Sequence, residues 1–553
     1  MKLSKLKNIN WIYPYLILLI FTIPNIVWIT LDQRVWPWDQ AWYGQVSVEL
    51  FYRLIHSRSG WFQEMISAFG TKAPGTAWLG QFFVPLGQLI GSIDTGLLLS
   101  IVATQFILWL LIYHTILKLT DSRLISIICC TFAASAPLSV ALTHQYFVEP
   151  LQTLSVAWVI LIMAFAPKWE SKTIALNLIS ATSLGMLAKI TFPLYTFIPI
   201  LVDVYYIYRN RKISKKRNQV DGKSGFSLVS LAPYISTVLL VSGLLLWYGK
   251  NFQSVLSFSI LASSGEASFL YGSKADFLYK IQYWLSASQK SFFTPTSVIC
   301  LLTLFIYTLA KSIYGFKKKK FNHIKLDYFD VMNIVAIVEI GLILVAFSFQ
   351  VNQENRYLLP LLPYLALLIA WILKRTRQKL LVFFAGFVLV LQLLTVQSQA
   401  LGIIPEDPNL SYWLYPIDRS SINKQLLSKL VDTTCKNETE KDRYNIIGLE
   451  LPWFNANSAS YFSAQQQLKK EFRCYYTSLG YAEKDMDKAW ARLFDLNINY
   501  FATLKPRSQA ETANPLNLVS LPILERIQKS PKFTREAFVD DQSHVLLYKK
   551  VSP

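Results

Sequence analysis

The chain has 553 residues, of which 53% are hydrophobic and only 16% are charged. This composition excludes an ordinary soluble multidomain protein, in which about a quarter of the residues are charged. A net charge of +20 would suggest nucleic-acid binding in a soluble chain, but here the cations lie between long apolar segments. We therefore expect an integral membrane protein that binds no nucleic acid.

About eleven apolar segments are long enough to cross a hydrocarbon core of about 30 Å. They predict an all-α polytopic membrane bundle over 1–400. The expected membrane helices are 12–31, 95–119, 124–142, 150–166, 174–190, 192–208, 226–248, 297–314, 329–349, 357–373 and 380–397. The first segment has no small-residue cleavage site, so we expect the protein to retain it as an anchor.

The positions of lysine and arginine predict the orientation of this bundle. Three lysines precede the first segment, and basic clusters follow every second segment thereafter, at 118–123, 168–172, 209–217, 317–320 and 374–379. Because basic loops stay in the cytoplasm, we expect a cytoplasmic N-terminus. The long connections 32–94 and 250–296 and the region 401–553 would then be extracytoplasmic. The large outer C-terminal region favours a bacterial plasma membrane.

The C-terminal region 401–553 has a different pattern. Helical stretches at 422–430, 459–472, 484–494 and 518–528 alternate with strand-like stretches at 444–451, 474–478 and 499–504 and a final strand within 538–551. This alternation is typical of a small α/β domain. The region has no GxGxxG or P-loop pattern, so we expect no nucleotide site.

The five cysteines fall into two groups. Cys129, Cys130 and Cys300 lie inside apolar segments and are expected to pack as buried thiols. Cys435 and Cys474 lie in the C-terminal region, where an oxidising compartment would allow them to form a disulfide.

An acidic residue, Asp39, lies among aromatic residues directly after the first apolar segment. A carboxylate at the membrane surface is costly unless function requires it, which favours Asp39 as a catalytic base. The alternative is that the aromatic residues form an interfacial belt and Asp39 caps the following helix. Beyond it, apolar residues at helical spacing over 42–54 and 61–69 predict two amphipathic helices in the membrane surface.

Other charged residues are expected at the outer ends of membrane segments. Lys72 and Lys189 could each bind phosphate or simply extend an ammonium group to the interface. Arg356 lies at the outer end of a membrane segment, where the positive-inside rule disfavours an arginine that only sets topology. This position favours a functional role for Arg356. Glu149 could orient a cation or be stabilised by the start of its helix. His144 and Glu149 are too few ligands to specify a metal, so a divalent metal stays open and no cofactor is certain.

The order of these features resembles the GT-C superfamily of polyprenyl-phosphate-dependent glycosyltransferases. The resemblance is greatest to the branch of protein O-mannosyltransferases and aminoarabinose lipid A transferases. It covers most of the membrane bundle, and includes Lys72-Ala73-Pro74, similar to a family Lys-Pro-Pro element, and Arg356-Tyr357-Leu358-Leu359-Pro360. It implies that Asp39 is the catalytic acid residue and that Lys72 contacts the donor phosphate. Gln40 replaces a second family carboxylate, so a metal or second-base role is not carried over to that position.

We therefore expect an inverting glycosyltransferase that moves a hexosyl or pentosyl group from a polyprenyl-phosphate-linked donor to a lipid, glycan or protein acceptor at the extracytoplasmic face. Asp39 would be the base, Glu149 an accessory carboxylate, and Lys72, Arg356 and Lys189 the phosphate ligands. Two alternatives stay open. A lipid-linked sugar flippase or transporter should have broken helices at the midplane and often an internal repeat. A non-catalytic membrane scaffold would leave these charged residues unexplained.

Overall fold

The computed structural model describes residues 12–217, 232–265, 268–318, 327–408, 410, 413–436, 443–505, 514–538 and 544–551. The lysines that precede the first apolar segment lie outside these residues, as do the side chains of 213–217 and 317–320. The chain divides into two compact units. The helical unit contains Met1–Thr30, Ile66–Thr76 and Leu98–Pro416, and the sheet unit contains Leu31–Met65, Ala77–Leu97 and Ile417–Pro553.

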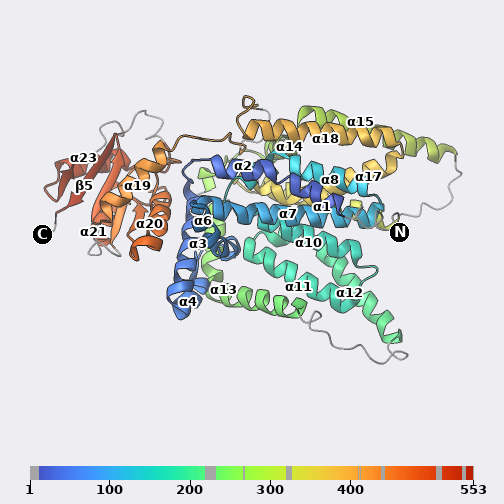
Figure 1. The fold of residues 1–553 in the computed structure, drawn as a ribbon, viewed down its shortest axis with the longest axis horizontal. Helices are drawn as coiled ribbons and strands as arrows, with labels where there is room; N and C mark the ends of the chain where they lie inside the picture. Colours follow the sequence, from blue (N-terminus) through green and yellow to red (C-terminus); the bar gives the residue numbers. More distant parts are fainter. Residues whose placement is uncertain are drawn as a thin grey trace, which may run out of the picture. The chain divides into compact units, whose positions relative to one another are not determined.

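Long helices make up most of the helical unit (Figure 1). They are α1 (Tyr13–Ile20), α2 (Ile23–Leu31), α7 (Ile93–Thr120), α8 (Arg123–Ser135), α9 (Pro137–Thr143), α10 (Glu149–Phe165), α11 (Ser171–Ala188), α12 (Phe197–Arg217), α13 (Ala232–Ser263), α14 (Phe277–Phe292), α15 (Pro295–Lys318), α16 (Tyr328–Phe349), α17 (Leu362–Thr376) and α18 (Lys379–Ala400). Short 3-10 helices lie between them: η3 (Phe192–Tyr195), η5 (Ser268–Leu270) and η6 (Asn355–Leu361).

Six helical stretches among the described residues are long and apolar enough to cross a membrane, or up to eight if each bent pair counts as one span. The bent pairs are α8 with α9, at 63°, and α14 with α15, at 104°. Pro137 and Pro295 begin the second helix of each pair, because the residue before a proline leaves the helical conformation. The protein is thus a multi-pass membrane protein, although the described residues do not confirm the expected count of about eleven spans. One reason is that α10 has only 17 residues.

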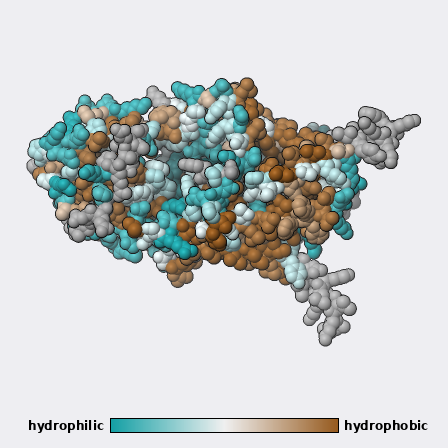
Figure 2. Space-filling model, turned by 90° about the horizontal axis from the view of Figure 1, so that it is seen from above, coloured by the Kyte–Doolittle hydropathy of each residue, from teal (hydrophilic) through white to brown (hydrophobic). Residues whose placement is uncertain are grey.

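Apolar side chains also cover the outside of the helical unit. Figure 2 shows brown, hydrophobic residues gathered over these helices. Leu239 of α13 is 67% exposed and Leu380 of α18 is 80% exposed. Exposing such apolar side chains to water is unfavourable, whereas contact with lipid tails is favourable. This surface is therefore the one expected of membrane helices.

The sheet unit begins with helices from the first long connection. These are α3 (Trp38–His56), α4 (Arg58–Ser67), α5 (Gly75–Gly80), η2 (Gln81–Phe83) and α6 (Val84–Ile90), of which α4 and α5 extend into the helical unit. The two helices expected over 42–54 and 61–69 are therefore confirmed as α3 and α4. A short break at Ser57, whose backbone is extended, separates them.

The C-terminal part of the sheet unit is an α/β domain, as expected. Its elements are α19 (Ile422–Thr434), β1 (Tyr444–Ile447), α20 (Ala456–Lys470), β2 (Tyr475–Ser478), α21 (Met486–Asp495), β3 (Tyr500–Leu504), α23 (Ser520–Lys529), β4 (Phe533–Glu536) and β5 (Val545–Lys550). The strand order is β2-β1-β3-β5-β4. Strand β1 is parallel to both neighbours, whereas β5 is antiparallel to β3 and β4. Only β4 was not expected from the sequence.

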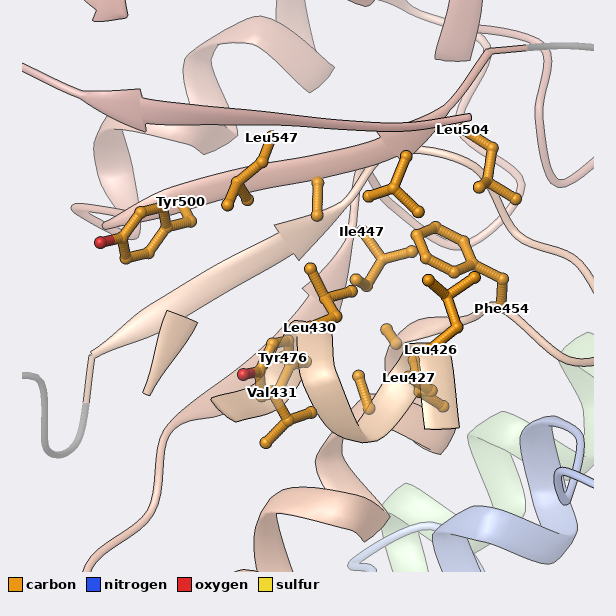
Figure 3. Packing of buried hydrophobic residues seen from close by; sticks show 14 of the residues in the cluster. Leu426, Leu427, Leu430, Val431, Ile447, Phe454, Tyr476, Tyr500, Leu504 and Leu547 are labelled. Atoms are coloured by element: carbon orange, nitrogen blue, oxygen red, sulfur yellow. The ribbon is translucent and has the colours of Figure 1, made fainter. Parts of the chain in front are cut away.

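Apolar residues cover both faces of this sheet. Because side chains alternate along a strand, Ile446 and Ile447 of β1 point to opposite faces and belong to different clusters. Figure 3 shows the Ile447 side, where leucines of α19 pack against the strands. Cys435 and Cys474 form a disulfide with a Cα–Cα distance of 5.8 Å, which joins the end of α19 to the start of β2.

Candidate functional site

Four charged side chains form a buried ion cluster in the helical unit: Glu149, Lys189, Glu354 and Arg356. Lys189 Nζ donates a hydrogen bond of 2.8 Å to Glu149 Oε1. Arg356 Nε lies 3.7 Å from the same oxygen and 3.3 Å from Glu354 Oε2. The Glu149 side chain is 1% exposed, and those of Lys189 and Arg356 are 20% and 10% exposed. Buried charges of this kind are retained only when they are paired.

Local sequence explains how these side chains are placed. Glu149 begins α10 with Pro150 directly after it, and a helix N-terminus stabilises a carboxylate. Lys189 directly follows α11, where the chain becomes extended. The turn after Lys189 brings the ring of Phe192 against Gly185. A β-carbon at Gly185 would lie 2.3 Å from this ring and would not fit. Gly185 therefore allows the turn that presents Lys189.

Aromatic rings surround the two cations. Lys189 Nζ lies 3.6 Å from the centroid of the Tyr357 ring. The guanidinium carbon of Arg356 lies 4.4 Å from the Phe147 ring and 5.7 Å from the Trp413 ring. These ring faces attract cations and also exclude water from them. The cluster therefore holds two cations in an environment of low polarity, where an anion is bound more strongly than in water.

The two cations of the cluster have the chemistry to bind phosphate. The Lys189 ammonium and the Arg356 guanidinium both lie next to Glu149 Oε1. Phosphate oxygens are well suited to both groups, since arginine can bind them in a bidentate way and lysine as a compact charge. Glu149 Oε2 is buried and has no hydrogen-bond partner among the described residues. Glu149 and Glu354 together balance the charges of Lys189 and Arg356, so the cluster is neutral until an anion is bound.

Lys72 lies in the same unit, within Ile66–Thr76. Its ammonium is 5.6 Å from the centroid of the Phe258 ring. The carbonyl of Thr76 accepts a 3.1 Å hydrogen bond from the Tyr146 hydroxyl, which ties the Lys72 segment to the chain just before Glu149. The structure therefore joins Glu149, Lys189 and Arg356 directly, whereas Lys72 is connected to them through the backbone of neighbouring segments.

His144 has partners of another kind. Its ring stacks on Trp28 with a centroid distance of 4.2 Å and an interplanar angle of 2°. Its Nε2 lies 2.9 Å from Asn25 Oδ1. No group of three or more His, Cys, Asp or Glu side chains that could hold a metal occurs among the described residues. Within the described part of the chain, His144 and Glu149 therefore belong to no such group.

Asp39 lies in the sheet unit, in the first turn of α3. A helix N-terminus attracts negative charge, so this position suits an acidic side chain. The residues before it are held by the C-terminal domain. Ser458 Oγ donates to the Trp36 carbonyl at 2.6 Å, and Asn457 Nδ2 donates to the Trp38 carbonyl at 3.3 Å. The Trp38 indole donates to Glu450 Oε2 at 3.0 Å.

Helices α3 and α20 pack closely together next to the segment that leads into Asp39. The Trp36 ring stacks on the Tyr461 ring with a centroid distance of 5.1 Å and an interplanar angle of 7°. Gly44 makes this possible, because a β-carbon there would lie 2.9 Å from both rings. Trp38 itself has φ = +25°, a strained value for a residue with a side chain, which its surroundings must maintain. The backbone that leads into Asp39 is thus fixed on several sides.

Glu450, beside the segment that leads into Asp39, was not expected from the sequence. It is 9% exposed, and burial raises the pKa of its carboxyl to about 7, against hydrogen bonds from Ala456 N–H and the Trp38 indole that lower it. The available signal in the sequence was a carboxylate at the end of the apolar stretch 444–451. Glu354, next to Arg356 in the cluster, was missed in the same way.

No protein-family model matches the chain, and neither does any curated protein sequence. Solved structures do match. The structure of ArnT from Cupriavidus metallidurans bound to undecaprenyl phosphate has a TM-score of 0.57 at 11% identity, with 98% of each chain covered. The mycobacterial arabinofuranosyltransferase AftD has a TM-score of 0.52 at 12% identity, covering 98% of this chain and 40% of AftD.

The oligosaccharyltransferase AglB from Archaeoglobus fulgidus, in complex with an inhibitory peptide and a dolichol-phosphate, has a TM-score of 0.50 at 10% identity. The match covers 98% of this chain and 75% of AglB. All three are GT-C glycosyltransferases. This chain therefore shares the fold of these three enzymes, which is the fold that the resemblance in its sequence implied.

Proposed function

We propose that the protein is an inverting glycosyltransferase that moves a sugar from a polyprenyl-phosphate-linked donor to a lipid, glycan or protein acceptor at the extracytoplasmic membrane face. The observation that carries this proposal is the buried ion cluster, in which Lys189 and Arg356 are paired with Glu149 inside an apolar helical unit. Undecaprenyl phosphate in ArnT and dolichol-phosphate in AglB support a lipid phosphate as the donor's anchor.

The cations serve the leaving group. When the bond between the anomeric carbon and the phosphate oxygen breaks, negative charge develops on the lipid phosphate. Preorganised cations stabilise that charge, so no general acid is needed. Lys189 and Arg356 bind the phosphate, Lys72 adds a third cation, and Glu149 keeps Lys189 and Arg356 in place as an accessory carboxylate.

Asp39 serves the acceptor. The acceptor oxygen attacks the anomeric carbon from the face opposite the phosphate, and Asp39 takes the hydroxyl proton as the new bond forms. The products are the glycosylated acceptor, a protonated Asp39 and the free lipid phosphate. One displacement of this kind inverts the anomeric configuration, whereas a covalent sugar intermediate would retain it.

The disulfide supports the extracytoplasmic assignment of the C-terminal domain. Disulfides persist in oxidising compartments and are rare in the cytoplasm. The bond between Cys435 and Cys474 lies in this domain, which agrees with the orientation expected from the basic loops.

A lipid-linked sugar flippase is the second candidate, because the pairs α8–α9 and α14–α15 are broken helices of the kind that transporters use. Purified protein in liposomes with a synthetic polyprenyl-phosphate sugar and membrane extract as acceptor source separates the two. A glycosyltransferase transfers the sugar to acceptor and leaves lipid phosphate. A flippase moves intact donor between leaflets without consuming it, and that result would refute the enzymatic proposal.

A further inference from the structure

A fully buried carboxylate, Glu339 of α16, has no part in the mechanism described above. Its two oxygens accept hydrogen bonds from the backbone N–H groups of Phe197 and Ile198, at 3.0 Å and 3.1 Å. These two residues begin α12, and the first N–H groups of a helix have no partner within the helix itself. Glu339 therefore fixes the start of α12 from a different helix.

Tyr195, two residues before α12, connects the two cations of the ion cluster. It is 1% exposed and belongs to η3, which follows Lys189 in the chain. Its hydroxyl donates a 2.7 Å hydrogen bond to the carbonyl of Tyr357. Tyr357 directly follows Arg356, and the centroid of its ring lies 3.6 Å from Lys189 Nζ. Tyr195 therefore joins the segment that presents Lys189 to the segment that presents Arg356.

The backbone around Tyr195 is itself held by other helices. The hydroxyl of Tyr364, a fully buried residue of α17, donates to the Tyr195 carbonyl at 2.5 Å. Nearer to Lys189, Gln152 Nε2 of α10 donates to Thr191 Oγ1 at 3.1 Å. Hydrogen bonds in such an apolar interior are stronger than in water. The turn between α11 and α12 is thus fixed from α10, α16 and α17.

The spacing of the two cations decides whether one phosphate can bind both of them. Lys189 Nζ and Arg356 Nε lie 2.8 Å and 3.7 Å from the same oxygen, Oε1 of Glu149, so they converge on one place. Charge-assisted hydrogen bonds have donor–acceptor distances of about 2.7–2.9 Å. A shift of about 1 Å in either cation is therefore enough to lose its contact with a phosphate oxygen.

We propose that Tyr195 is a positioning residue of the ion cluster. Its hydroxyl holds Lys189 and Arg356 at the spacing that lets both bind one lipid phosphate, while Tyr364 and Glu339 hold Tyr195 in place. This proposal rests on the proposed function, in which the cluster binds the phosphate of the donor. It adds residues that set the affinity of that site without touching the ligand.

The test measures binding of a polyprenyl phosphate without sugar to the full-length protein in liposomes. Tyr195→Phe removes only the hydroxyl, and affinity should fall roughly three- to tenfold, the value of about one hydrogen bond. Tyr328→Phe is the matched control, because the Tyr328 hydroxyl also donates to a carbonyl, that of Met163, near the end of α10 remote from Glu149. The control should keep the affinity of the wild type. Equal weakening in both variants, or in neither, would overturn the proposal.

A second measurement separates positioning from stability. Tyr195→Phe should have no further effect on lipid binding in a protein that carries Glu149→Gln and Lys189→Met, because the spacing of two cations no longer matters there. A further loss of the same size would show that Tyr195 does not act through Lys189, and would contradict the proposal.

Glu339→Gln covers the case in which Tyr195→Phe does not fold. Its amide oxygen can still accept one of the two backbone hydrogen bonds, so the start of α12 should loosen without being lost. Lipid binding should weaken in this variant when Lys189 is present and stay unchanged when Glu149→Gln and Lys189→Met are added. Weakening in both backgrounds would overturn the positioning role. Failure of the wild-type protein to bind the lipid phosphate would instead refute the proposed function.

Discussion

The indole nitrogen of Trp38 donates a 3.0 Å hydrogen bond to the buried carboxylate of Glu450. The residue directly before Asp39 is thereby held by a residue between β1 and α20 of the C-terminal α/β domain. Glu450 is in turn fixed, because its backbone N–H donates to Asn517 Oδ1 at 2.7 Å and its Oε1 accepts from Ala456 N–H at 3.1 Å. The C-terminal domain therefore sets the geometry of the segment that leads into the proposed base.

Replacing Glu450 should lower kcat more than it weakens donor binding. Glu450→Ala removes the partner of the Trp38 indole, and a shift of about 1 Å at a reacting group can cost roughly a hundredfold in rate. Glu450→Gln should recover part of the rate, since its amide oxygen can still accept one hydrogen bond. Steady-state kinetics with donor binding measured in parallel would check this, with the exposed Glu525→Ala as control. A rise in donor Kd with unchanged kcat would contradict the positioning role.

Glu450 should also make stability depend on pH. Burial raises the pKa of its carboxyl from an ordinary 4.5 to about 7, so the folded protein binds more protons than the unfolded chain between these values. Stability from this group is full below pH 4.5 and is lost as pH rises towards 7, by about 3 kcal/mol in total. Thermal unfolding of the wild type and Glu450→Gln from pH 4.5 to 8 measures it. Parallel curves for the two proteins would show that the carboxyl does not titrate in this range.

Removing Lys189 should weaken donor binding and also destabilise the fold. Lys189→Met removes a charge-assisted hydrogen bond to phosphate, which should weaken binding of a polyprenyl phosphate roughly 10- to 100-fold. It also leaves Glu149 with one cation fewer, and breaking a buried ion pair costs about 3–5 kcal/mol.

A double variant separates these two effects. Glu149→Gln with Lys189→Met removes both charges, so thermal stability should recover while binding of the lipid phosphate stays weak. Binding that recovers together with stability would mean that Lys189 has only a structural role.

Loss of the disulfide should destabilise the protein without preventing membrane insertion. The bond between Cys435 and Cys474 closes a stretch of 39 residues, and chain-entropy estimates give about 4 kcal/mol for a loop of this size. The double variant Cys435→Ser with Cys474→Ser should therefore unfold at a lower temperature. Thiol labelling of the native protein should leave both residues unmodified until a reductant is added. Labelling without reductant would contradict both the bond and the extracytoplasmic assignment of this domain.

The sequence predicted which helices and strands are present better than it predicted where the membrane spans begin and end. Periodicity was sufficient for α3, α4 and most of the C-terminal strands and helices, because apolar residues recur in each sequence at the spacing of the element. The number of spans was harder to predict, since hydropathy does not distinguish a straight span from two helices bent at a proline such as Pro295. Strand β4 has the burial pattern of an exposed edge, which gave no apolar signal.

The candidate site could be predicted only as separate residues. Arg356 stood out because a cation at that end of a segment has no topological reason, and Glu149 because it is a carboxylate at the outer start of a membrane segment. That they share one cluster with Lys189 depends on how α10, α11 and η6 pack, which no local pattern encodes. Glu450 was missed because its contact with Trp38 is between residues that are distant in the sequence.

The most direct test of the proposed function compares sugar transfer by the wild type and Asp39→Asn. Both proteins are reconstituted in liposomes with synthetic polyprenyl-phosphate sugars and membrane extract as acceptor source. We expect transfer by the wild type and a fall of roughly 10²- to 10⁴-fold in the variant, the usual contribution of a general base, with donor affinity unchanged. Equal transfer by both proteins would contradict the role of Asp39 as the base.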